Sequence, residues 1–303
     1  MNRPHTYFAH GMTIASEIEI PEFGTSQGEA DLDVSIAGVP ECIPDCRRRG
    51  VRFQAAPGHY LLTIDGVASY EVLGGHTVRI QPAAGSSESD IRVFLHSSVM
   101  GAVVHQRGLL PLHASSVEMF GRAVLIAGAS RSGKSTLAMA LNKKGFPIIS
   151  EDLTVLRATP AGTVLAFPGT LRFKLTPRSV GLLSIPENEL RPGRQGTGKF
   201  FVSPSGIASK ADLEVSRIYW LTPSVRESTG LRPLTGVEKF SAVMTNTFRH
   251  KFVDAFGTSV DHFQHCSSVT RAVPVARLCR NVNDHDLDGL AELIKASENH
   301  HAC

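Results

Sequence analysis

The run from Gly128 to Ser135 reads GASRSGKS and fits the phosphate-binding pattern G-x-x-x-x-G-K-[ST]. A loop that wraps a polyphosphate points backbone N–H groups at the phosphate oxygens, and it needs glycine where a Cβ would clash. The pattern predicts that Lys134 reaches the β- and γ-phosphates and that the Ser135 hydroxyl is a ligand of a bridging Mg²⁺. The predicted nucleotide-binding residues are Gly128, Ala129, Ser130, Arg131, Ser132, Gly133, Lys134, Ser135 and Thr136.

The flanking sequence supports this candidate phosphate loop (residues 128–135). Ala123 to Ala127 is an uninterrupted apolar run typical of a buried strand, and Ser135 to Lys144 predicts a helix that ends at Gly145. The phosphates would then meet a helix N-terminus with free N–H groups and a favourable dipole. The alternative is a glycine turn with a purely structural role.

Composition excludes some classes of protein. The chain has 303 residues and 42% hydrophobic residues, enough for one large or two modest domains. Its 31 basic residues are almost balanced by 28 acidic ones, which argues against a nucleic-acid partner. Residues 1–20 contain no continuous apolar stretch, and no run of about 18 apolar residues occurs, so we expect a cytoplasmic protein with no membrane partner.

Five cysteines, an odd number, indicate reduced thiols rather than a disulfide framework. Cys42 and Cys46 do not have a zinc spacing, and neither does the stretch from His262 to Cys266. We interpret these as ordinary core or surface side chains.

The order of the patterns predicts two domains. Short alternating runs such as Leu32 to Ile36 and Thr77 to Gln81 predict strands, and the apolar spacing from Ile91 to Val103 predicts a helix that Gly108 terminates. The next predicted elements are a hairpin with its turn at Phe120-Gly121-Arg122, strands over 146–156, 163–167 and 218–221, and a last helix around Leu287, Leu290 and Ile294. We therefore expect a β-rich N-terminal domain over residues 1–103 and an α/β nucleotide domain over 104–303.

Two adjacent acids, Glu151 and Asp152, follow the apolar strand at residues 147–150. Open α/β sheets place ligands at the carboxyl ends of their strands. Because neighbouring residues on an extended chain point in opposite directions, one carboxylate is expected to face Mg²⁺ and the other an incoming hydroxyl. The alternative is a solvated acidic turn. His113 lies shortly before the hairpin and, from its spacing alone, is more typical of a structural histidine.

The residues from Leu112 to Val117, the block from Ala123 to Thr136, Gly145, and the sequence Ser150-Glu151-Asp152 together resemble the catalytic domain of the HPr kinase/phosphorylase family. The resemblance implies a P-loop kinase fold, shared with phosphoenolpyruvate carboxykinases, that phosphorylates a serine hydroxyl with ATP and Mg²⁺. It implies that Glu151 and Ser135 lie at the metal, that Asp152 is the general base and that His113 supports the acidic pair. It also implies that the chain could form a homo-oligomer, because the best-known members of the family are hexameric.

The chain departs from that family at two places. Glu151 stands where the family usually has aspartate, and the residues from Phe167 to Phe173 replace a glutamate-containing, glycine-rich signature. The whole chain resembles more closely the divergent kinases of lasso-peptide biosynthesis, through Tyr7 to Ile20, Gln106-Arg107-Gly108 and His262-Phe263.

The sequence therefore predicts an ATP-dependent serine kinase acting on a peptide or protein, specifically at the C-terminal serine of a lasso-peptide precursor. Arg172, Arg194 or Lys199 would add a further cation. Two alternatives stay open: a kinase for HPr or for a small hydroxylated metabolite, and a nucleotide-binding regulator without catalysis.

Overall fold

The structure is a computed structural model that describes residues 4–193, 198–207, 212–284 and 286–299. The chain forms two compact units. The first contains Met1–Pro111 and Thr247–His265, and the second contains Leu112–Asn246 and Cys266–Cys303. These units differ from the expected division after residue 103, because the helical segment at the end of the first stretch continues past that point and the chain later returns to pack against it.

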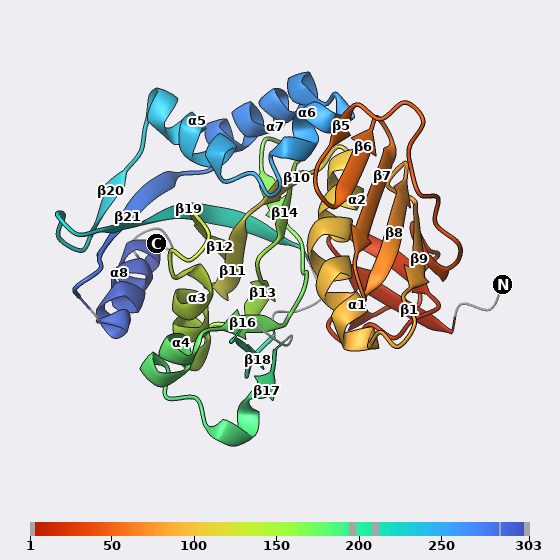
Figure 1. Ribbon diagram of the computed structural model, residues 1–303. Coiled ribbons are helices and arrows are strands. Elements are labelled where there is room, and N and C mark those ends of the chain that lie inside the picture. The colour runs from red at the N-terminus through yellow and green to blue at the C-terminus, as the bar shows by residue number, and fades with distance from the viewer. Residues whose placement is uncertain (1–3, 194–197, 208–211, 285, 300–303) are drawn as a thin grey trace. The chain divides into compact units, whose positions relative to one another are not determined.

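The first unit is built on a sheet with the strand order β3-β1-β2-β4-β9-β8-β7-β6-β5 in the described part of the chain (Figure 1). The strand β4 is parallel to both of its neighbours, β2 and β9, and the other pairs are antiparallel. The strands are β1 (His5–Ala9), β2 (Met12–Ser16), β3 (Gly24–Thr25), β4 (Leu32–Ile36), β5 (Arg48–Arg49), β6 (Phe53–Ala56), β7 (His59–Ile64), β8 (Ala68–Leu73) and β9 (Thr77–Pro82).

The helical segment predicted over residues 91–103 is present in this unit, and it runs along the sheet (Figure 1). It consists of α1 (Glu88–Phe94), a π-helical turn η1 (Leu95–Val99) and α2 (Met100–Gln106), and Gly108 follows it in the left-handed region with φ of 67°. The returning segment contributes α6 (Lys251–Phe256), which packs on α2 and β6, and the first part of α7 (Ser259–Ala272).

The second unit contains a mixed sheet with the order β14-β15-β19-β12-β11-β13, and β21 pairs with both β19 and β20. The strands β12, β19 and β21 are mutually parallel. The strands are β11 (Ala114–Met119), β12 (Arg122–Ala127), β13 (Ile148–Ser150), β14 (Thr154–Ala158), β15 (Val164–Ala166), β19 (Leu213–Ser224), β20 (Gly230–Pro233) and β21 (Val275–Asn281), and β10 (Leu110–Leu112) is where the chain enters this unit.

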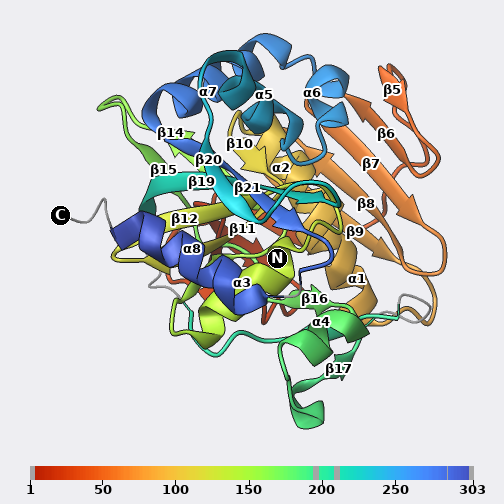
Figure 2. The ribbon, with the colours of Figure 1, turned by 90° about the vertical axis from the view of Figure 1, so that its left-hand side faces the viewer.

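Helices cover both faces of this sheet. The helices α3 (Lys134–Lys143) and α8 (Leu287–Asn299) pack against each other on one face, and α5 (Gly236–Thr245) lies with the end of α7 on the other (Figures 1 and 2). The core under α3 includes Val124, Ile126, Leu137 and Ile294, none more than 1% exposed. A small sheet lies beside it, made of β16 (Phe173–Leu175), β18 (Phe200–Val202) and β17 (Arg191–Pro192), with α4 (Pro177–Leu182) and the 3₁₀ turn η2 (Glu187–Glu189).

The elements around the candidate phosphate loop match the sequence prediction closely. The strands β11 and β12 form an antiparallel hairpin whose turn, Phe120 and Gly121, has φ angles of 52° and 75°. Two consecutive positive φ values suit a two-residue hairpin turn, because their twist matches that of the strands. The helix α3 ends as predicted, with Gly145 just beyond it at a φ of 94°.

The prediction of a single strand over residues 146–156 is wrong. The chain forms β13, breaks at residues 151–153 and resumes as β14 in a different pairing. Asp152 has a φ of 66°, and the Leu153 amide donates to the Glu151 carbonyl at 2.7 Å, so Asp152 is the central residue of a tight turn. The apolar pattern continues through the break because Leu153 and Val155 are also buried.

Candidate functional site

The candidate phosphate loop connects the buried strand β12 to α3. Gly128 has a φ of 155°, and a Cβ placed there would lie 2.6 Å from the Leu221 carbonyl oxygen. Gly133 and Arg131 have φ angles of 107° and 67°. The glycines therefore allow the backbone to turn back on itself and to place the first N–H groups of α3 at the loop.

Lys134 is buried at the start of α3, with 5% of its surface exposed. Its Nζ donates to the carbonyl oxygens of Gly128 at 2.9 Å and of Ala129 at 3.0 Å. Burial lowers the pKa of Lys134, and the nearby charges of Asp152 and Glu151 oppose that shift. The ammonium group thus lies across the loop, next to both acids.

The remaining loop residues differ in exposure. Ala129, Ser130 and Arg131 are exposed, whereas Ser132 is buried and its Oγ has no hydrogen-bond partner in the described part of the chain. Thr136 donates from Oγ1 to Ser179 Oγ at 2.9 Å, which connects α3 to α4. Thr136 therefore has a structural contact that the sequence did not predict.

Glu151 lies behind the loop and is 5% exposed. Its carboxylate accepts hydrogen bonds from Ser135 Oγ at 2.6 Å and from Ser115 Oγ at 2.5 Å. Burial and the adjacent negative charge of Asp152 raise the pKa of Glu151, and the two serine hydroxyls and Lys134 oppose that rise. A buried carboxylate with a raised pKa is an environment that a cation would stabilise.

Asp152 and His113 lie together, as the resemblance implies. His113 Nε2 is 3.2 Å from Asp152 Oδ1, and the His113 amide donates to the Asn246 carbonyl at 2.8 Å. The two acids have different partners, as expected, but the expected reason, an extended chain, is wrong, since Asp152 has left-handed backbone geometry. It is the tight turn that directs Glu151 toward Ser135 and Asp152 toward His113.

Asp152 keeps its negative charge at neutral pH. Desolvation raises its pKa, but the hydrogen bond with His113 and the positive charges of Lys174 and Lys134 outweigh that effect and lower the pKa of Asp152 to about 2. Its side chain is 42% exposed, which leaves room for a second partner on the solvent side.

Lys174 belongs to this site, although the sequence analysis did not select it. It lies on β16, where burial lowers its pKa and the charge of Asp152 opposes that shift, while Arg172 lowers it further. Arg172, one of the three candidate cations, stacks over Phe201 at 4.2 Å from the ring centroid. Lys199 is exposed and acts on Lys174 only through its charge, and Arg194 lies outside the described residues. The available signal was the position of Lys174 two residues after Arg172, a candidate cation that directly precedes β16.

Arg280 is a second residue that the sequence analysis missed. It lies near the end of β21, and its Nη2 donates to the Ser132 carbonyl at 3.5 Å. No motif marks it, because only the parallel pairing of β21, β19 and β12 brings this part of the chain beside the loop.

The residues fit Mg²⁺ bound together with a nucleotide. Ser135 and Glu151 offer the hard oxygen ligands that Mg²⁺ prefers, and they already lie within hydrogen-bonding distance of each other. Across the described residues, no group of three or more His, Cys, Asp or Glu side chains could hold a metal ion by itself. Mg²⁺ usually takes one or two protein ligands and completes its shell with phosphates and water, which agrees with this arrangement.

The four described cysteines and His262 do not belong to this site. Among the described residues, Cys42, Cys46, Cys266 and Cys279 are not joined by disulfide bonds. His262 Nε2 is 2.8 Å from Thr247 Oγ1, within the first unit.

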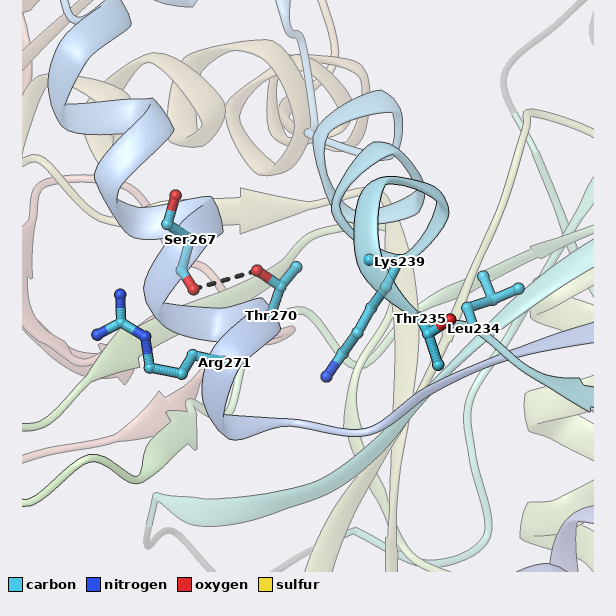
Figure 3. Close-up of a pocket in the computed structure, with 7 residues that line it drawn as sticks. Leu234, Thr235, Lys239, Ser267, Thr270 and Arg271 are labelled. Carbon is cyan, nitrogen blue, oxygen red and sulfur yellow. Dashed lines mark hydrogen bonds between the residues drawn. The ribbon is translucent and has the colours of Figure 1, made fainter.

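A separate cavity of about 430 Å³ lies between α5 and the end of α7 in the second unit (Figure 3). It is lined by polar and charged residues that include Thr235, Lys239, Thr270 and Arg271. In Figure 3 the long side chains of Lys239 and Arg271 extend from different helices without converging on a common point. None of the lining residues belongs to the candidate phosphate loop or to the acidic pair.

No helix among the described residues has both the length and the apolar character needed to cross a membrane.

Comparison with known proteins gives one weak sequence relationship. The chain is 28% identical over 112 residues to an HPr kinase/phosphorylase of Exiguobacterium sibiricum. The aligned segment covers 37% of this chain and 32% of that protein. The chain thus spans about a third of the length of the curated relative that it matches. No protein-family model matches the chain.

Among solved structures, the HPr(Ser) kinase/phosphatase of Coxiella burnetii aligns with 64% of this chain and 99% of that chain, with a TM-score of 0.35 and 11% identity. The chain's own sheets and helices make it a mixed α/β protein, and the 112-residue match shows weak homology to an HPr kinase/phosphorylase.

Proposed function

We propose that this protein is an ATP-dependent kinase that phosphorylates a serine hydroxyl on a peptide or protein. The observation that carries the proposal is the position of the ionised Asp152 carboxylate, which His113 holds beside Lys134 at the mouth of a glycine-containing loop. A loop that only binds nucleotide has little need of a second, partly exposed carboxylate next to the metal-binding one. This argues against the regulator without catalysis.

In the proposed reaction the serine oxygen attacks the γ-phosphorus of ATP. A new O–P bond forms to serine, the bond from the γ-phosphorus to the β,γ-bridging oxygen breaks, and ADP leaves with that electron pair. Asp152 accepts the serine proton. When bound, Mg²⁺ neutralises part of the charge on the β- and γ-phosphate oxygens.

Each neighbouring side chain has a distinct role in this proposal. Lys134 exchanges its carbonyl partners for phosphate oxygens. Ser135 and Glu151 hold the metal, and Ser115 orients the Glu151 carboxylate. His113 fixes the direction of Asp152 and, together with Lys174, keeps it ionised, and Lys174 adds positive charge where the γ-phosphate would lie.

For the substrate, we propose the C-terminal serine of a lasso-peptide precursor. The support is the resemblance along the whole chain, from Tyr7 in the first strand to His262 in α7. The β-rich N-terminal region, residues 1–103, would take part in binding the peptide.

HPr is the second candidate substrate. The 112-residue match to an HPr kinase/phosphorylase favours it. The departures at Glu151 and at residues 167–173 are what distinguish this chain from that family, and they are the reason for placing HPr second.

The test is mass spectrometry of two substrates, a serine-ended lasso-precursor peptide and HPr, each incubated with the protein, ATP and Mg²⁺. We expect the peptide alone to gain one phosphate. A gain on HPr alone would reassign the substrate, and no gain on either, despite measured ATP binding, would contradict the peptide and HPr assignments. The Lys134→Ala protein is the control, because it removes the phosphate-binding cation and should give no product.

A further inference from the structure

The three parallel strands of the second unit place Arg280 at the level of the candidate phosphate loop. In the register of the sheet, Ala127 at the end of β12 is aligned with Trp220, and Trp220 is aligned with Arg277. Arg280 is three residues further along β21, which is about 10 Å at the rise of a parallel strand. It therefore lies beyond the edge where β12 ends and the loop begins, which is where parallel sheets bind ligands.

The hydrogen-bonding groups of Arg280 are largely unused. Its Nε is buried and has no hydrogen-bond partner within the described ranges, and its one contact, from Nη2 to the Ser132 carbonyl, is long at 3.5 Å. A Cβ built on Gly133 would lie 3.9 Å from the same Nε, so the guanidinium group is adjacent to the loop backbone. A buried donor without a partner costs free energy unless a ligand accepts its hydrogen bond.

The charges around Arg280 favour an anion. Burial lowers its pKa, and the positive charge of Arg178 on α4 lowers it further, while Asp284 opposes the shift. The Asp284 carboxylate accepts a hydrogen bond from Thr229 at 3.1 Å. The positive charges of Arg280 and of Arg178, which acts on it, would both attract an anion, whereas Asp284 would oppose one.

Arg280 lies at a different part of the loop from the catalytic acids. Lys134, Glu151 and Asp152 mark the end where the γ-phosphate would lie, whereas Arg280 contacts the loop at the Ser132 carbonyl and lies close to Gly133. The Ser132 hydroxyl, for which the described residues offer no hydrogen-bond partner, is in the same region.

We propose that Arg280 is a nucleotide-positioning residue that binds the α- and β-phosphates of the nucleotide from the β21 side of the loop. This inference rests on the proposed function, because it takes a nucleotide as the ligand of the loop. A planar guanidinium can donate two parallel hydrogen bonds to one phosphate, which a lysine cannot do.

The test is the dissociation constant of Mg·ADP, measured by calorimetry for the wild type, Arg280→Ala, Arg280→Lys and Arg277→Ala. Arg277 is the matched control, because it is on the same strand but pairs with Glu227 at 2.6 Å. We expect Arg280→Ala to weaken binding about tenfold or more, Arg280→Lys to recover part of the loss, and Arg277→Ala to bind within about twofold of the wild type. Non-hydrolysable ATP should show the same ratios, because the γ-phosphate would not contact Arg280.

The outcomes separate this inference from the proposed function. Equal Mg·ADP affinity of wild type and Arg280→Ala would overturn the role of Arg280 and leave the kinase proposal intact. Absence of binding by the wild type would overturn both. Thermal unfolding without nucleotide checks that each variant folds. If Arg280→Ala does not fold, Arg280→Lys and Arg280→Gln take its place. Wild-type affinity for Mg·ADP in both of these variants would overturn the inference.

Discussion

His113 Nε2 and Asp152 Oδ1 are 3.2 Å apart, although one residue precedes β11 and the other follows β13. The antiparallel pairing of these strands, with Ser116 opposite Ser150, brings the two side chains to the same edge of the sheet. The contact orients the carboxylate and contributes to its low pKa.

Replacing Asp152 by asparagine should abolish most phosphoryl transfer. The amide keeps the shape of the carboxylate but cannot accept the serine proton, so we expect at least about a hundredfold loss of rate, measured by mass spectrometry of the phosphorylated substrate. Mg·ADP binding should be retained, because Asp152 does not hold the loop. An unchanged rate in a folded Asp152→Asn protein would contradict the role of Asp152 as the base.

Replacing Lys174 by methionine tests whether β16 contributes to the site. Lys174 holds the pKa of Asp152 down, so its loss should raise that pKa and shift the acid limb of the pH–rate profile to higher pH. The rate at neutral pH should fall about tenfold or more, because a cation near the transferring phosphoryl group is lost. Lys199→Met, at an exposed position, is the comparison and should have a smaller effect.

Replacing Glu151 by glutamine should stabilise the nucleotide-free protein at neutral pH. The pKa of Glu151 is raised in the folded state, so the protonated side chain contributes to the free energy of unfolding below its unfolded-state pKa of 4.5. This contribution is lost as the pH rises through the folded-state pKa. We expect a melting temperature a few degrees higher than that of the wild type at pH 7.5, with little difference at pH 4. Mg²⁺-dependent nucleotide binding should weaken, since a metal ligand has been removed, and equal Mg²⁺ dependence in the two proteins would argue against Glu151 as a ligand.

The first unit should lose stability in mild acid because of His10. This residue is fully buried, neither ring nitrogen has a hydrogen-bond partner in the described structure, and burial, with a smaller effect from His96, lowers the pKa of His10 to about 3. Folding favours the neutral form of His10, so the free energy of unfolding is highest above pH 6.5. It falls as the pH drops toward 3, and we expect a loss of about 2 kcal/mol at pH 5. Melting temperatures at pH 7.5 and pH 5 should differ less in His10→Leu than in the wild type. Substitution of the exposed His76 by leucine should leave that difference unchanged.

Replacing Gly128 by alanine should destabilise the second unit. The new Cβ would lie 2.6 Å from the Leu221 carbonyl oxygen, a backbone atom of the central strand β19 that cannot easily move. We expect a loss of about 2 kcal/mol or more, measured by chemical denaturation. Gly181→Ala, where nothing lies within 4 Å of the new Cβ, is the control, and an equal effect of the two substitutions would show that the clash is not the cause.

The sequence predicted the parts of the site whose geometry is local. The glycines of the candidate phosphate loop, the buried strand before it and the helix after it lie where the motif and the apolar run place them, because turn conformation and helix capping depend on neighbouring residues. The hairpin at Phe120 and Gly121 was predictable for the same reason. The prediction failed at Asp152, because the buried Leu153 and Val155 continue the apolar pattern through a turn that the strand pairing imposes.

Only the tertiary structure decided which distant residues surround the loop. Lys174 comes from a short strand of a separate small sheet, and Arg280 comes from β21, far along the chain. The assignment of residues 247–265 to the first unit likewise depends on the packing of α6 against α2. Such contacts are set by strand order and packing, which join segments without any pattern in the intervening sequence, whereas a motif records only the conformation of its own residues.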